Sequence, residues 1–114
     1  MDAFTEAYLI AALFSSCDDN GRPLDDRYTA DDIAPESLAR AVADCAAFQT
    51  LHADAIGDCA SQAGHDLWLT RNGHGAGFWD GDWPEPAATA LTAAAHCYGE
   101  SYPYVGDDGR IYFA

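Results

Sequence analysis

The chain has 114 residues and a formal net charge of −14, because 19 Asp and Glu side chains are opposed by only five basic ones, all arginine. The hydrophobic fraction of 49% is enough to build the core of one domain, which argues against a disordered chain. The longest apolar run, residues 7–14, is much shorter than the roughly 20 residues of a membrane span, and no basic residue precedes it as in a secretory signal, so we expect a cytoplasmic protein.

The first half of the chain predicts two helices. Residues 2–16 are apolar on almost every side, which is typical of a helix that is buried or that pairs with a partner. After a polar loop, Thr29 and Asp32 have the spacing of a capping box around a short turn. Pro35 suits the first position of a second helix, which we expect to run to about Cys59.

A hairpin is predicted next, in the glycine-rich stretch LTRNGHGAGFWDGDW. The alternation of apolar and polar residues in HDLWLTRN, which starts at His65, predicts a strand, and the later GFWD is its expected partner. We expect residues 69–71 to pair with residues 78–80, with the glycines turning between them. Arg71 and Asp80 would then form an ion pair across the two strands.

A third helix and a second hairpin complete the predicted order. The alanine-rich residues 84–99 predict a helix that begins at prolines and ends at Gly99. Residues 102–113, YPYVGDDGRIYF, predict two short aromatic strands around a Gly-Asp-Asp-Gly turn. The order helix, helix, hairpin, helix, hairpin predicts a single α+β domain over residues 1–114, with helices packed on a small antiparallel sheet.

The four cysteines predict neither a metal site nor a disulfide. Cys45, His52 and Cys59 repeat every seven residues along one predicted helix face, which separates neighbours by about 10.5 Å along the axis. Ligands of one zinc ion lie about 2.0 to 2.3 Å from the metal, so no two of these residues can share one. We expect no metal and no cofactor, and we expect Cys45, Cys59 and Cys97 to be reduced and buried.

Two interpretations of the glycine-rich stretch stay open. Its glycines fit a tight turn, but few hairpins place so many polar side chains beside one. The second interpretation is a ligand-binding or catalytic site. Its candidate residues are His65, Asp66, Arg71, Asn72, His74 and Asp80.

The excess of acidic residues predicts the class of partner. A surface of this charge repels nucleic acid and anionic lipid and attracts basic proteins, so we expect no direct binding of nucleic acid or membrane. The same composition also arises from GC-rich coding sequence, and a high net charge keeps a protein soluble. The candidate contacts are the carboxylates of the acidic loops: Asp18, Asp19, Asp25, Asp26, Asp31 and Asp32.

The stretch AGHDLWLTRNGHGAGFWD, with DDIAPESL before it and YVGDDGRIY after it, resembles a widespread family of small phage and mobile-element proteins. The resemblance implies a phage-like origin and a soluble intracellular protein, and it implies no activity or catalytic residue. We therefore expect a non-enzymatic acidic protein that occludes the basic nucleic-acid-binding surface of a host or defence protein, as a nucleic-acid mimic in the host cytoplasm. The alternative is a small enzyme or ligand-binding module centred on residues 71–80.

Overall fold

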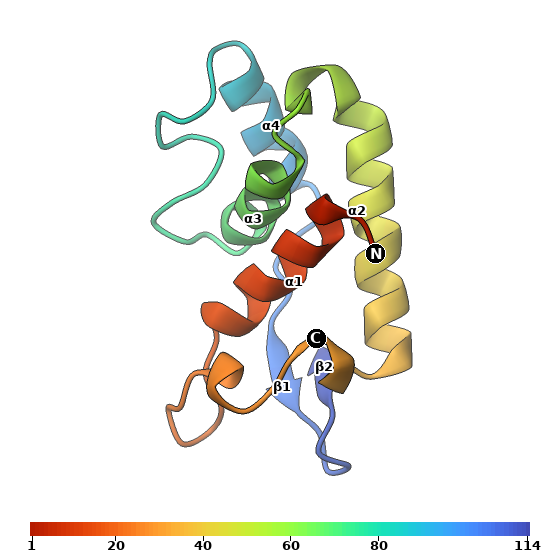
Figure 1. The fold of residues 1–114 in the computed structure, drawn as a ribbon. Coiled ribbons are helices and arrows are strands. Elements are labelled where there is room, and N and C mark those ends of the chain that lie inside the picture. The colour runs from red at the N-terminus through yellow and green to blue at the C-terminus, as the bar shows by residue number, and fades with distance from the viewer.

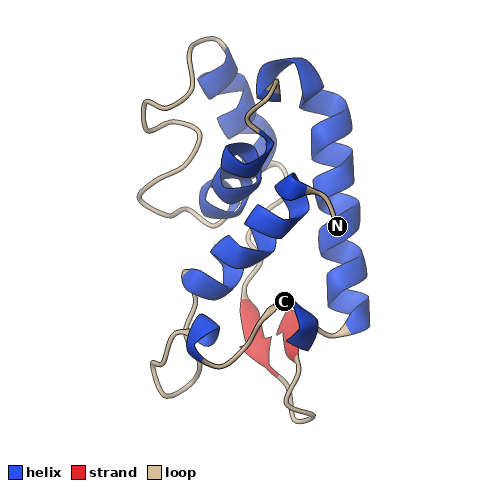
Figure 2. Ribbon diagram, viewed as in Figure 1, coloured by secondary structure: helices blue, strands red, loops and turns tan.

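The computed structural model describes all 114 residues and shows four α-helices with one two-stranded antiparallel sheet, which confirms the predicted α+β domain. Figure 1 shows α1 and α3 next to each other in the middle of the molecule, with the long α2 along one side. The small sheet lies at the opposite end from α4 (Figure 2). The elements are α1 (Ala3–Phe14), α2 (Pro35–Ile56), α3 (Ala60–Arg71), α4 (Ala87–His96), β1 (Pro103–Val105) and β2 (Ile111–Phe113).

Helices α1 and α3 pack with their backbones unusually close together. Asp2 begins α1 by accepting a hydrogen bond of 2.8 Å from the backbone N–H of Thr5. Gly64 of α3 lies against Phe4 of α1, and a Cβ atom built on Gly64 would be 2.0 Å from the Phe4 carbonyl oxygen. Because no other residue lacks a Cβ atom, only glycine at position 64 permits this approach.

The predicted start of α2 is confirmed, and its end comes at Ile56, slightly earlier than the predicted end near Cys59. Thr29 and Asp32 form the expected capping box, and the backbone N–H of Thr29 donates to Asp32 at 2.8 Å. Pro35 is the first residue of the helix. The helix ends at Ile56, before Cys59, because Gly57 follows it in a left-handed conformation with φ of 55°.

The predicted first hairpin is wrong, because residues 60–71 form the helix α3 and residues 77–80 form turns. The buried residues Ala63, Leu67 and Thr70 recur at intervals of four and three, which is the period of one helix face. The alternation that predicted a strand covers only a few residues, too few to exclude a helix. The expected Arg71–Asp80 ion pair is absent, since Arg71 pairs with Asp44 at 3.2 Å.

The second hairpin is confirmed, and the third helix is confirmed over a shorter range, Ala87–His96, than the predicted residues 84–99. Helix α4 ends at His96, and Gly99 follows it with φ of 72°. Strands β1 and β2 pair antiparallel in the register Tyr104 to Tyr112. Ile111 of β2 also forms a parallel bridge with Ile33, which attaches the hairpin to the segment that leads into α2.

Further contacts of β2 hold the beginning of α2. The backbone N–H of Ala34 donates to the carbonyl of Ile111 at 2.8 Å. The backbone N–H of Phe113 donates to the Ser37 hydroxyl at 3.1 Å, and the Arg40 guanidinium donates to the Phe113 carbonyl. Residues more than 70 positions apart in the chain are therefore hydrogen-bonded at this end of the domain.

The core forms around Phe48, which is fully buried on α2. Its ring centroid lies 6.0 Å from that of Phe4, 5.7 Å from that of Phe78 and 6.0 Å from that of Tyr98. One α2 side chain therefore contacts aromatic residues from α1, from the loop before α4 and from the segment after it.

None of the helices combines the length and the apolar character needed to cross a membrane.

The cysteines differ in their exposure. No cysteine is in a disulfide, and Cys45 is buried as expected, but Cys59 and Cys97 are exposed, so their predicted burial is wrong. Cys59 leaves the buried stripe because α2 has already ended, and Cys97 lies just beyond α4. Burial raises the pKa of the Cys45 thiol to about 12, which keeps it protonated at neutral pH.

We expect a thiol reagent at neutral pH to modify Cys17, Cys59 and Cys97 in the folded protein and to modify Cys45 only after unfolding. The first three side chains are exposed, whereas the Cys45 thiol is buried and protonated. Counting the thiols that react with and without denaturant, with peptide mapping of the labelled cysteines, checks the expectation. Equal labelling rates for all the cysteines in the folded protein would contradict the buried position of Cys45.

Candidate functional site

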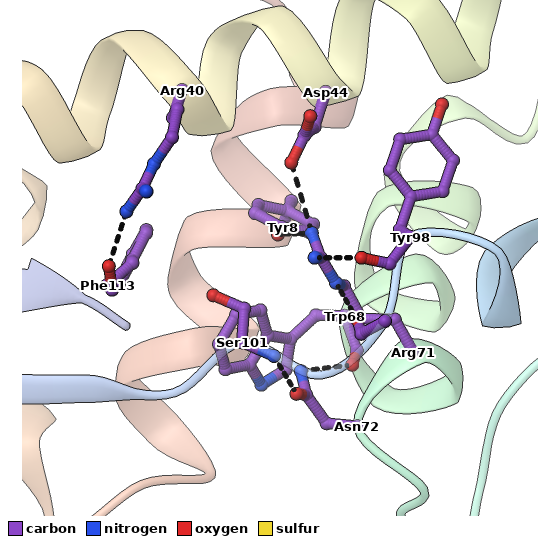
Figure 3. A network of polar contacts seen from close by, with 10 residues as sticks. Tyr8, Arg40, Asp44, Trp68, Arg71, Asn72, Tyr98, Ser101 and Phe113 are labelled. Atoms are coloured by element: carbon purple, nitrogen blue, oxygen red, sulfur yellow. Dashed lines mark hydrogen bonds and ion pairs between the residues drawn. The ribbon is translucent and has the colours of Figure 1, made fainter.

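Arg71, the last residue of α3, lies at the centre of a polar network that Figure 3 shows from close by. Its side chain is 7% exposed. Nε donates to the Gly99 carbonyl at 2.8 Å, and Nη2 donates to the Tyr98 carbonyl at 2.9 Å. Nη1 donates to the Tyr8 hydroxyl at 3.0 Å and to Asp44 Oδ2 at 3.2 Å. A single guanidinium thus joins α1, α2, α3 and the segment that follows α4.

The surroundings of Arg71 extend the same network. Burial raises the pKa of the Tyr8 hydroxyl to about 12, so this group stays neutral beside the Arg71 charge. Asn72 accepts a hydrogen bond of 2.8 Å from the backbone N–H of Ser101 and donates to the Trp68 carbonyl at 2.9 Å (Figure 3). Arg71 and Asn72 therefore fix the chain after α4 to the end of α3.

Asp66 forms a second buried polar centre on α3. This carboxylate is 2% exposed and accepts hydrogen bonds from Trp83 Nε1 at 2.7 Å and from Gln62 Nε2 at 3.0 Å. The Nδ1 atom of His65 lies 3.2 Å from its other oxygen. The contact with Trp83 attaches the loop before α4 to α3, so Asp66 is enclosed by side chains of the chain itself.

The glycine-rich stretch packs back onto α3 through Thr70. The backbone N–H of Phe78 donates to the Thr70 hydroxyl at 3.0 Å. A Cβ atom on Gly77 would be 2.2 Å from the same hydroxyl, so glycine allows the contact. Asp80 accepts a hydrogen bond of 3.2 Å from the backbone N–H of Gly77, which makes it part of the turn.

The six candidate residues of the glycine-rich stretch are not gathered around one cavity. His65 lines a groove against α1, and Arg71 lines a different cavity beside α2. His74 is half-buried, and its backbone N–H donates to the Leu69 carbonyl at 3.0 Å. The side chains of Asp66, Arg71, Asn72 and Asp80 all make hydrogen bonds within the chain. No group of three or more His, Cys, Asp or Glu side chains is placed to hold a metal ion.

Sequence reasoning missed the partners of these polar residues. Tyr8 and Asp44 contact Arg71, and Trp83 contacts Asp66, yet none of the three was a candidate. The available signal was the position of Tyr8 in the apolar stripe of the first helix. A buried tyrosine hydroxyl needs a polar partner, so the position of Tyr8 called for a polar side chain from elsewhere in the chain.

The acidic loops between α1 and α2 contain two kinds of carboxylate. Asp18 accepts hydrogen bonds from the backbone N–H groups of Asn20 and Arg22 at 2.9 and 3.0 Å, and Asp32 caps the turn at Thr29. These two side chains are half-buried and stabilise the loops. The remaining candidates are exposed and form no ion pair: Asp19, Asp25, Asp26 and Asp31.

No protein-family model, curated protein or solved structure matches this chain.

Proposed function

We propose that this chain is a non-enzymatic acidic protein of phage-like origin that occludes a basic nucleic-acid-binding surface of a host or defence protein in the host cytoplasm. One observation carries the proposal. Asp19, Asp25, Asp26 and Asp31 point carboxylates into solvent without a basic partner, in a chain whose net charge is −14. Such carboxylates take the place of phosphates when they meet clustered lysine and arginine.

The alternative, a small enzyme or ligand-binding module centred on residues 71–80, has less support. Catalysis needs a nucleophile, a base or charge-stabilising groups directed at one point. Arg71 and Asp80 instead bond to separate parts of the chain, and His74 lacks a hydrogen-bonded carboxylate to orient its ring. The contacts of this stretch support a structural role.

The test is a pull-down from host lysate on the immobilised chain, at low and at high salt, with and without added double-stranded DNA. Exposed charge pairs are screened over about 8 to 10 Å at physiological ionic strength, so we expect capture to weaken steeply as salt rises. DNA should compete, because it would occupy the same basic surface on the partner. Changing Asp19, Asp25, Asp26 and Asp31 to Asn should weaken binding at least about tenfold.

The matched control removes the same number of charges elsewhere on the surface. Its exposed positions are Asp54, Asp58, Glu100 and Asp107, changed to the corresponding amides. This variant and His74→Ala should retain most of the binding. A captured partner that ignores salt and the loop variant, but is lost with His74→Ala, would overturn the proposal in favour of a site on the glycine-rich stretch.

A further inference from the structure

An open groove of ≈ 510 Å³ runs between α1 and α3. Ala3, Ala7 and Ile10 line it from α1, and Gln62 and His65 line it from α3. None of the groups that bond to Arg71 contributes to it, although Gln62 and His65 also contact the buried Asp66. The groove is therefore separate from the Arg71 network, and its α1 wall is apolar except for Glu6.

The apolar wall continues beyond the groove along one face of α1. Ala3, Ala7, Ile10 and Phe14 follow one another at intervals of three or four, so they share one side of the helix. Ile10 is 59% exposed and Phe14 is 71% exposed, while the opposite side of α1 packs into the core. A stripe from residue 3 to residue 14 is about 16.5 Å long at 1.5 Å per residue, which is about three turns of a second helix.

The charges around the groove are acidic. Glu6 lines it, and the Gln62 side chain on its α3 wall donates to Asp82 at 3.5 Å, so a second carboxylate lies beside that wall. Asp2 caps α1 directly before Ala3. None of the five arginines lines the groove.

These charges decide which occupant fits. A second copy of this chain also carries a net charge of −14, so two copies repel each other, and an anionic bilayer would likewise be repelled. Nucleic acid is excluded by its charge. A segment that presents apolar side chains on one face and lysine or arginine beside them satisfies both the stripe and the acidic rim, and an amphipathic helix does so over the length available.

We propose that the groove between α1 and α3, extended by Phe14, binds a basic amphipathic helix of the protein partner. This inference rests on the proposed function, since it takes the partner to be basic. It adds the apolar anchor, Ile10 and Phe14, that charged loops cannot supply. Protein–protein interfaces usually have apolar side chains at the centre and charged side chains at the rim.

The test uses two synthetic peptides with the same composition and charge, measured by calorimetry on the full chain. One repeats the sequence LKKLLKL, which places leucines on one helix face, and the other scrambles the same residues so that no face is apolar. We expect the amphipathic peptide to bind at least about tenfold more tightly than the scrambled one. Changing Ile10 to Gln or Phe14 to Gln should each remove about tenfold of that affinity.

Leu51→Gln is the matched control, because Leu51 is 74% exposed on α2 and lies outside the groove. It should leave both affinities unchanged, and circular dichroism should show that all three variants keep the parent's helix content. If the two peptides bind with equal, salt-sensitive affinity, or if Leu51→Gln and Ile10→Gln lower the affinity equally, the proposed groove site is wrong. Attraction to basic partners would still stand in that case. Failure of both peptides to bind at low salt would overturn the proposed function together with the groove.

Discussion

Replacing Arg71 by alanine is expected to lower the free energy of unfolding by about 3 kcal/mol or more, a large part of the roughly 5 to 15 kcal/mol that stabilises a typical domain. The substitution leaves the Gly99 and Tyr98 carbonyls, the Tyr8 hydroxyl and Asp44 without their donor. The Tyr8 hydroxyl is buried and keeps the full penalty of having left water, whereas the other three acceptors are partly accessible and regain some contact with water. Urea unfolding followed by circular dichroism measures the change.

Two further variants test whether the stability loss comes from the hydrogen bonds of the Arg71 guanidinium. Arg71→Lys keeps the charge but replaces the planar fork by a single ammonium, so it should recover only a small part of the stability. Arg27→Ala is the matched control, because Arg27 is exposed, its side chain forms no hydrogen bond or ion pair, and its guanidinium lies over the ring of Tyr28. This variant should change stability by about 0.5 kcal/mol or less. If Arg71→Ala unfolds at the same urea concentration as the parent, the network does not hold the helices together and Arg71 becomes a candidate for ligand binding.

Gly64→Ala is expected to destabilise the fold by about 3 kcal/mol, although alanine favours an isolated helix over glycine by about 1 kcal/mol. The substitution is destabilising overall because of the contact with α1, where the new Cβ atom would be 2.0 Å from the Phe4 carbonyl oxygen. That oxygen belongs to the backbone and cannot rotate away, so the two helices must separate. The thermal unfolding midpoint should fall by about 10 °C or more for a domain of this size.

Gly75→Ala is the control for this substitution. Nothing lies within 4 Å of a Cβ atom at Gly75, and its backbone is not in the left-handed region. The midpoint should therefore stay within about 4 °C of the parent. A Gly64→Ala protein that melts together with the Gly75→Ala protein would show that α1 and α3 do not pack at the distance described.

Local signals in the sequence predicted the elements whose partners are nearby in the chain. The hairpin of β1 and β2 has its strands and its turn within a dozen residues, and the capping box between Thr29 and Asp32 involves residues three apart. Pro35 marks the start of α2 for a reason that no distant residue can change, since a proline at the first helical position loses no hydrogen bond. Such features follow directly from the order of the amino acids.

The helix α3 was mistaken for a strand because its partners are distant. Asp66, Thr70 and Arg71 interrupt the apolar pattern as solvent-facing residues would, yet all three are buried. Their burial depends on groups as far away as Tyr8, which is 63 positions from Arg71. Distant partners also explain why these residues were proposed as a site. The unusual residues of the glycine-rich stretch could be recognised in the sequence, but the distant side chains that hydrogen-bond to them could not.

The contacts between β2 and the start of α2 also govern how the chain folds as it is made. The Ser37 hydroxyl and the backbone N–H of Phe113 that bonds to it are separated by 76 residues. At a synthesis rate of about 5 to 20 residues per second, about 4 to 15 seconds pass between their appearance. During that interval Ile33 has no β2 strand to bridge, and the first turns of α2 lack their anchor. The domain therefore completes its fold only after Ile111 and Phe113 have left the ribosome, and until then its apolar segments are open to chaperones.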